Sequence, residues 1–149
     1  MKTKLLILSG FLFIFSACNK NQFTTRPQLS FESMSTNVLA PGNTITFTLK
    51  YTDKEGDIQD SLYVEKVTQN CTQSDFTAYY KISDQVPVQH NSEGDILVTY
   101  GYLTGQAIPE IKGPVCLEND TCVMRFVLRD KQKNASDTVS TPPLVILKQ

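Results

Sequence analysis

The sequence has no tryptophan and only one histidine, His90. Zinc sites that depend on several histidines are therefore excluded. The sequence also contains neither a nucleophile-elbow motif nor a glycine-rich phosphate-binding loop. Lysine and arginine, 14 residues against 15 acidic ones, give no excess of positive charge for nucleic acid. We therefore expect a protein that is not an enzyme and does not bind nucleic acid.

Long apolar segments are absent as well, except for one short run at the N-terminus. The run extends from Leu5 to Phe15 and follows two lysines. It is well short of the about 20 apolar residues that a membrane-spanning helix needs, whereas a basic start and a short apolar run are typical of a secretory signal. Ser-Ala directly precedes Cys18, as in the lipobox of bacterial lipoproteins. An ordinary signal peptide is the alternative, because Ala17 would also suit that peptidase.

The lipobox defines the expected organisation of the chain. Residues 1–17 would be a lipoprotein signal peptide, residues 18–26 a lipidated tether and residues 27–149 a single domain. Cleavage would leave Cys18 at the new N-terminus with a diacylglyceryl group on its thiol, and several acyl chains such as palmitate hold a protein stably on a membrane. We therefore expect the protein in the cell envelope, outside the cytoplasm and on the outer membrane.

Cysteine is scarce, and its number in the expected mature domain is odd. Cys71, Cys116 and Cys122 remain there, and an exported protein permits disulfides. The turn-rich stretch between Cys116 and Cys122 could close a hairpin and place the two thiols opposite each other. We therefore expect a Cys116–Cys122 disulfide, with a bond from Cys71 to either of them as the alternative.

The rest of the sequence has no helical periodicity of useful length and alternates in the manner of β-strands. The clearest strand is Thr44 to Thr52, where apolar residues alternate with threonine and lysine, and the second clearest extends from Cys122 to Arg129. Weaker candidates are Leu29–Met34, Leu62–Val67, Thr77–Ile82, Ile96–Leu103 and Thr138–Leu147, the last interrupted by Pro142 and Pro143. The pattern predicts an all-β fold, a single immunoglobulin-like β-sandwich of about seven strands, with a small barrel as the alternative.

Two loops of equal length follow the two clearest strands and resemble each other. Residues 53–60 and residues 130–137 both begin with Asp-Lys and both end in aspartate. In an immunoglobulin-like sandwich they would connect the second strand to the third and the sixth to the seventh, and these connections emerge at the same end of the fold. We therefore expect a set of oxygen-bearing side chains to gather there: Asp53, Asp57, Asp60, Asp130, Asn134 and Asp137.

Converging carboxylates repel each other unless something neutralises them. Ca²⁺ suits the expected cluster, because it takes about six to eight oxygen ligands and tolerates irregular loop geometry. The loops are not EF-hands, since they lack the bidentate glutamate. The alternative needs no metal: aspartate and asparagine are common turn residues, and Lys54, Lys131 and Lys133 could compensate the charge.

Several stretches together resemble the small lipoproteins of Bacteroidota that carry an immunoglobulin-like or cadherin-like mature domain. Beside the lipobox, these stretches are Tyr51–Ile58, Phe126–Lys131, Asn134–Val139 and Thr141–Leu144. The resemblance implies an envelope lipoprotein and no particular activity. Members of that group usually carry Asp-Gly-Asp-Gly-Asp in the first loop and a glycine in the second, and here Glu55 and Lys133 depart from that pattern.

These observations together predict a non-enzymatic, membrane-anchored lipoprotein that works as a binding or interaction module of the cell envelope. Its partners would be the membrane, through Cys18, and another envelope protein or a polymer. One alternative is a structural assembly subunit of an envelope complex. Another is an accessory domain of a secreted hydrolase system.

Overall fold

The computed structural model describes residues 23–149, so the expected signal peptide and Cys18 lie outside the described residues. Strands make up nearly all of the regular structure in this part of the chain. In chain order the elements are β1 (Gln28–Met34), β2 (Val38–Leu39), β3 (Thr44–Asp53), β4 (Ser61–Thr68), the 3-10 helix η1 (Thr72–Ser74), β5 (Phe76–Lys81), β6 (Ser92–Gly101), β7 (Asp120–Arg129), β8 (Val139–Ser140) and β9 (Leu144–Ile146). No helix among the described residues is long and apolar enough to cross a bilayer.

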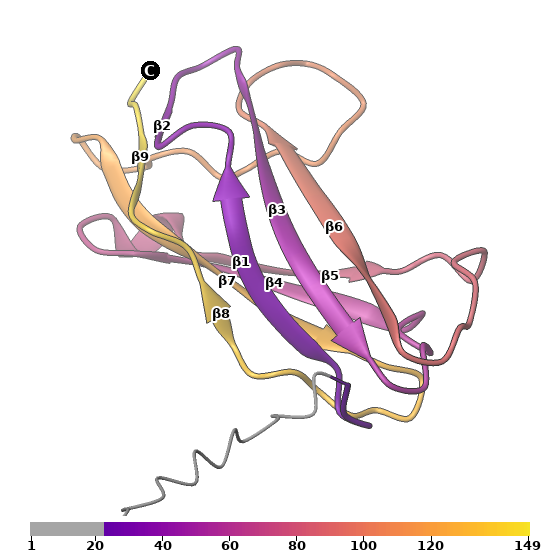
Figure 1. The fold of residues 1–149 in the computed structure, drawn as a ribbon. Coiled ribbons are helices and arrows are strands. Elements are labelled where there is room, and N and C mark those ends of the chain that lie inside the picture. The colour runs from indigo at the N-terminus through magenta and orange to yellow at the C-terminus, as the bar shows by residue number, and fades with distance from the viewer. Residues whose placement is uncertain (1–22) are drawn as a thin grey trace, which may run out of the picture.

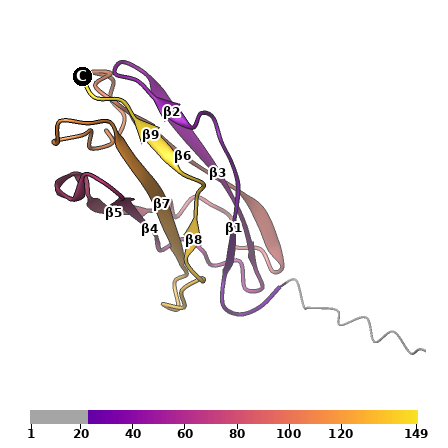
Figure 2. The same ribbon diagram turned by 90° about the vertical axis from the view of Figure 1, so that its left-hand side faces the viewer.

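The strands form two sheets that pack face to face (Figure 1, Figure 2). The first sheet has the order β1-β3-β6, and the second has the order β2-β9-β7-β4-β5, with β8 beside β7. All neighbouring strands are antiparallel except β2 and β9. The order β1-β3-β6 corresponds to strands A, B and E of an immunoglobulin sandwich, and β4-β7-β9 corresponds to strands C, F and G. The predicted immunoglobulin-like sandwich is therefore confirmed.

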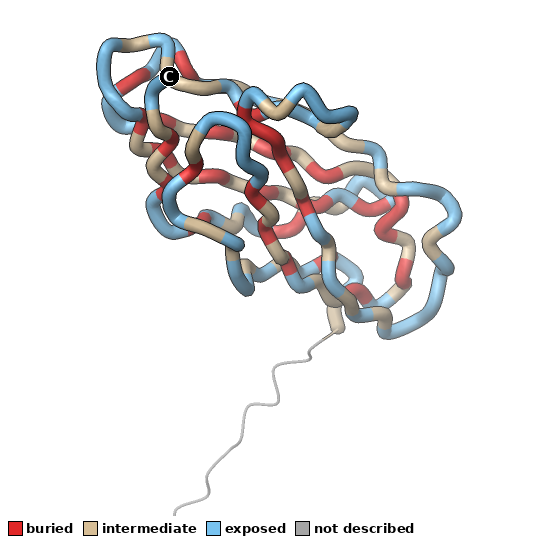
Figure 3. The backbone as a smooth tube through the Cα atoms, turned by 90° about the horizontal axis from the view of Figure 1, so that it is seen from above, coloured by how far each residue is buried: buried red, intermediate tan, exposed pale blue. Residues whose placement is uncertain are grey.

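The alternation seen in the sequence builds the core between the sheets. In β3 the side chains of Ile45, Phe47 and Leu49 are fully buried, and the residues between them face outward. Phe47 meets Phe126 of the opposite sheet, with ring centroids 5.5 Å apart. Figure 3 shows the buried positions along the strands and the exposed ones at the loops. Each fully buried apolar side chain of this size stabilises the fold by about 1.5–3 kcal/mol.

Proline divides the last predicted strand in two. Pro142 and Pro143 separate β8 from β9, and β9 begins at Leu144. A proline cannot donate a backbone hydrogen bond to a neighbouring strand, so a break at this point was expected. Another difference concerns β6, which begins at Ser92 and ends at Gly101, earlier than the predicted range of 96–103. Gly94 and two acidic residues weaken the apolar pattern at its start, but β3 pairs with it along its whole length.

The strands give the sandwich two ends of different character (Figure 1). We call one end the acidic pole, formed by residues 24–26, 53–60, 82–91 and 130–137. We call the other end the disulfide pole, formed by residues 69–75 and 102–119. The chain enters β1 at the acidic pole and leaves β9 at the disulfide pole.

Candidate cation site at the acidic pole

Three of the predicted carboxylates meet at the acidic pole. Asp53 ends β3 and Asp130 follows β7, and both residues are fully buried. Together with Asp57, each offers an oxygen atom, and these three atoms lie within 4.8 Å of one another. The predicted convergence of the two loops is therefore confirmed for these residues, because β3 and β7 both end at this pole.

Backbone contacts hold the two loops against each other. The Lys131 N–H donates to the Asp57 carbonyl oxygen at 2.9 Å, and the Gln132 amide donates to the Asp57 carboxylate at 3.3 Å. Gly56 has φ = +72°, and a Cβ at this position would lie 2.0 Å from the Gln89 carbonyl oxygen. Only glycine fits there, so residues 53–60 also pack closely against residues 82–91.

Only one of the two carboxylate oxygens of Asp53 accepts hydrogen bonds from described residues. Its Oδ2 accepts the Gly56 N–H at 2.5 Å and the Asp57 N–H at 3.2 Å. Its Oδ1 is buried and accepts no hydrogen bond from any described residue, and the same holds for Asp57 Oδ1, Glu55 Oε2 and Gln59 Oε1. Buried polar atoms in proteins are nearly always hydrogen-bonded. Four oxygens of one loop are therefore without a hydrogen-bond donor among the described residues.

The electrostatics of Asp53 reflect the same arrangement. Burial raises the pKa of its carboxyl group above the ordinary value, and the negative charges of Asp57 and Glu55 add to the rise. The N–H groups of Gly56 and Asp57 act in the opposite direction and reduce it only in part. A cation beside the carboxylate would favour its charged form and reverse this effect.

Of the other three predicted residues, Asp60 and Asp137 form ion pairs, and Asn134 lies beside the cluster through Asp130. Asp60 pairs with the Lys133 ammonium group at 2.6 Å, which holds the pKa of this carboxyl below its ordinary value. Asp137 pairs with Arg26 at 2.9 Å on the surface. Asn134 donates its backbone N–H and its side-chain amide to the two oxygens of Asp130, both at 2.8 Å. A lysine therefore compensates the negative charge of Asp60, whereas no described lysine pairs with Asp53.

The predicted set of ligands included neither Gln59 nor Glu55. Gln59 is buried, and its amide donates to the Val86 carbonyl oxygen at 2.8 Å. Nothing in the sequence distinguishes it from a solvated loop residue, because residues 82–91 cover it only in the folded chain. Glu55 carried a signal, since it alternates with Asp53 and Asp57 as the first ligands of a calcium loop do.

The segment that precedes β1 lies against the same pole. The Lys54 N–H donates to the Thr24 carbonyl oxygen at 3.1 Å, and Arg26 donates to the Ala135 carbonyl oxygen as well as to Asp137. Both loops of the acidic pole are thus in contact with the chain where it enters the domain.

The predicted Cys116–Cys122 disulfide is wrong, because Cys116 is bonded to Cys71, with a Cα–Cα distance of 5.8 Å. No strand precedes the turn at residues 117–119, so the expected hairpin does not form. Cys122 belongs to β7, whose register turns its side chain into the core. Burial there raises the pKa of the Cys122 thiol to about 12.

Comparison with known proteins gives similarities of fold only. No family model matches the chain, and no curated protein matches it. Among solved structures it is similar to the sporulation control protein Spo0M of Bacillus subtilis, with a TM-score of 0.45 and 10% identity over 83% of this chain, which spans 50% of that protein.

Two smaller proteins are similar over most of their own length. The PKD domain of an M14-like peptidase from Thermoplasmatales archaeon SCGC AB-540-F20 gives a TM-score of 0.40 and 14% identity, covering 83% of this chain and 94% of that one. A Niemann-Pick type C2 protein from the Japanese carpenter ant gives a TM-score of 0.43 and 11% identity, covering 81% and 94%. All three TM-scores lie below 0.5, so no function follows from them.

Proposed function

We propose that this protein is a non-enzymatic, lipid-anchored module of the bacterial cell envelope whose acidic pole binds Ca²⁺. The observation that carries the cation site is Asp53. It is fully buried, its Oδ1 accepts no hydrogen bond from any described residue, and one of its oxygens lies in a cluster with oxygens of Asp57 and Asp130. An ionised carboxylate in this position is costly unless a positive charge accompanies it. The anchor rests on the lipobox at Cys18.

Ca²⁺ fits this donor set better than other common ions. The cluster offers oxygen atoms only, and its donors come from loops, whereas Mg²⁺ demands near-ideal octahedral geometry and zinc favours nitrogen and sulfur. Asp53, Asp57 and Asp130 would supply the first ligands, and Glu55 and Gln59, each with a buried oxygen that accepts no hydrogen bond from a described residue, are further candidates in the same loop. Water would complete the coordination.

The position of the site suggests what the ion would do for an anchored domain. Residues 53–60 contact Thr24, and residues 130–137 contact Arg26, so both ligand-bearing loops touch the segment that leads from the anchor. An ion that joins the two loops would hold the domain in a fixed orientation above the membrane. The module would then display its remaining surface to a partner protein or polymer of the envelope.

Thermal unfolding of the full-length protein tests the cation site. Calcium should raise the Tm, because a ligand that binds only the folded state stabilises it by about 2.7 kcal/mol at a concentration of 100 Kd. Asp53→Ala combined with Asp130→Ala should abolish the rise. Asp60→Asn is the matched control, since Asp60 lies in the same loop but is paired with Lys133, and it should leave the rise intact. A Tm unchanged at millimolar calcium would contradict the proposal.

Metabolic labelling with a clickable fatty acid tests the anchor. Cys18→Ser should abolish labelling and release the protein from membranes, whereas Cys122→Ser should change neither. Labelling that persists in the Cys18→Ser variant would show that the acyl group is elsewhere or that the lipobox is not used.

A further inference from the structure

The strand β6 is the least protected sheet edge in the described part of the chain. Edge strands invite pairing with other chains, and proteins usually protect them by shortness, bulges or charged side chains. Of the other three edges, β1 is interrupted by an irregularity between Phe31 and Ser33, β2 has 2 residues and β5 has 6. β6 has 10 residues in unbroken register with β3. It contains neither proline nor lysine, and its two charged residues, Glu93 and Asp95, lie in its first half.

The hydrogen bonds at the end of β6 reveal which backbone groups face outward. The Tyr102 N–H donates to the Asn43 carbonyl oxygen on the β3 side, at 2.9 Å. The Gly101 N–H donates to Pro109 on the opposite side at 2.9 Å, where the Gly101 carbonyl oxygen accepts the Ile111 N–H at 2.8 Å. Successive residues of an antiparallel strand direct their N–H and C=O groups to opposite sides. Three residues therefore direct theirs away from β3, and no described strand pairs with them: Asp95, Leu97 and Thr99.

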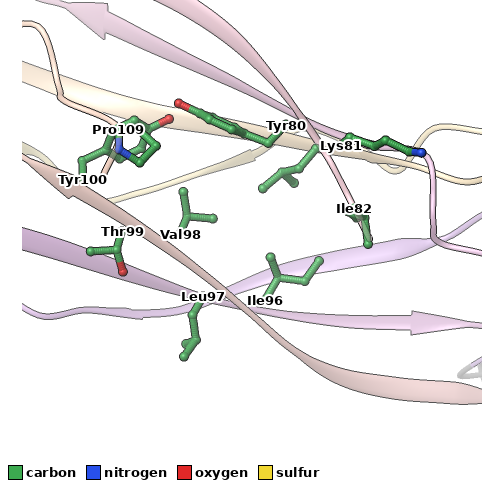
Figure 4. A pocket seen from close by; sticks show the side chains of 10 residues that line it. Tyr80, Lys81, Ile82, Ile96, Leu97, Val98, Thr99, Tyr100 and Pro109 are labelled. Carbon is green, nitrogen blue, oxygen red and sulfur yellow. The ribbon is translucent and has the colours of Figure 1, made fainter. Parts of the chain in front are cut away.

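An apolar cavity lies beside this edge, between β6 and β5. Its volume is ≈ 300 Å³. Figure 4 shows Val98 of β6 facing Tyr80 of β5 and Ile82, which follows it, and Leu62 completes the lining from β4. An immunoglobulin constant-type sheet has a fourth strand, D, next to strand E, but here residues 82–91 form no strand. The cavity therefore opens where the inward side chains of that absent strand would lie.

The geometry points to a strand-accepting surface: we infer that β6 pairs with an extended segment of a partner protein, which takes the place of the absent fourth strand. The open backbone groups of β6 select a strand over a helix, and alternate side chains of the strand would enter the cavity. Inward positions should therefore be aliphatic. On the outer face the strand would pass Leu97, which is 67% exposed, and Asp95, which favours a lysine or arginine opposite it.

This inference supplies the partner that a display module needs, and it does not depend on the cation. It can be tested by hydrogen–deuterium exchange of the full-length protein in EGTA, so that failure leaves the calcium site untouched. The probe is a synthetic capped peptide in which valine alternates with threonine and lysine, added at millimolar concentration. We expect amide exchange to slow at least tenfold at Asp95, Leu97 and Thr99, with little change at the intervening residues, which β3 already protects.

Two controls separate strand pairing from other kinds of contact. The same peptide with every backbone nitrogen methylated keeps its side chains but cannot pair, so it should not slow exchange. Leu97→Pro removes an N–H that β3 does not use and should abolish binding with β3–β6 pairing intact, whereas Leu97→Thr keeps the N–H and should bind within a few-fold of the native protein. Equal protection by the methylated peptide, or none by the free one, would overturn the inference. So would a dimer in sedimentation velocity that Leu97→Pro dissociates, because the occupant would then be a second copy of this chain.

Discussion

The two poles of the sandwich are closed in opposite ways. At the disulfide pole Cys71 is bonded to Cys116. Next to this pole, Lys66 of β4 pairs with Asp120 of β7 at 2.6 Å, with both side chains fully buried. Lys66 also donates to the Lys112 carbonyl oxygen at 2.6 Å, so residues 102–119 are tied to β4. At the acidic pole no described lysine or arginine pairs with the buried Asp53 or Asp130, and the ion pairs that form there are partly or largely exposed.

This difference indicates which pole a bound ion could stabilise. A pole closed by a covalent bond and a neutralised buried charge gains little from a ligand. A pole whose buried carboxylates pair with no described lysine or arginine would be stabilised by a bound cation. The chain also enters the domain at the acidic pole, so a change there would act on residues 24–26, which contact both loops.

The strongest way to break the disulfide pole is to remove one partner of its buried ion pair. Lys66→Met would leave Asp120 buried and unpaired, and we expect it to lower the free energy of unfolding by about 3–5 kcal/mol. Adding Asp120→Leu to the same chain should recover much of this loss, because the unpaired charge is gone. Denaturant unfolding of the single and double variants measures both steps. If the double variant is no more stable than Lys66→Met alone, the unpaired charge of Asp120 is not the cause of the loss.

Removing the disulfide should have the next largest effect. Cys71 and Cys116 are 45 residues apart in sequence, and losing a bond of this kind costs about 2–4 kcal/mol, because the unfolded chain gains freedom. The variant with Cys71→Ser and Cys116→Ser should unfold at lower denaturant. Reductant should destabilise the native protein in a similar way and leave the variant unchanged. If reductant destabilises the variant as well, its effect on the native protein cannot be assigned to the Cys71–Cys116 bond.

At the acidic pole a single substitution should have opposite effects with and without calcium. Asp53→Asn keeps an oxygen for the Gly56 and Asp57 N–H groups and removes the unpaired charge, so without calcium it should stabilise the fold by about 1 kcal/mol. In calcium the native protein should become the more stable of the two, since the variant has lost a ligand. Thermal unfolding of both proteins in EGTA and in calcium measures this reversal of their relative stability. Destabilisation under both conditions would mean that the Asp53 charge is already neutralised.

The smallest effect is expected from the Lys133–Asp60 pair of the same pole. Lys133→Ala should cost about 0.2–1 kcal/mol, as do other exposed ion pairs. Because Lys133 lowers the pKa of Asp60 in the folded state, this stabilisation is present above the ordinary carboxyl pKa and is lost as the pH falls through the lowered one. The difference between variant and native protein should therefore vanish in acid. If the stability difference persists in acid, it comes from packing of the lysine stem and not from the ion pair.

Much of the fold and part of the site could be predicted from the sequence. Period-two alternation located the strands, since it reports directly which side chains face a core. The likeness of the two loops predicted that Asp53 and Asp130 meet, because both follow strands that end at the same pole. Asn134 also lies beside Asp130. The pairing of Asp60 with Lys133 and of Asp137 with Arg26 could not be predicted, because it depends on side-chain directions that loop sequences do not encode.

The sequence by itself determined a β-sandwich with two acidic loops at one pole, because local patterns and chain order are enough for these. Only the tertiary structure decided that Cys71 pairs with Cys116, that Lys66 neutralises Asp120 and that Asp53 is buried with an unpaired oxygen. The physical reason is the same in each case. Distance between side chains and exclusion of water arise from segments far apart in sequence, and no local pattern records them.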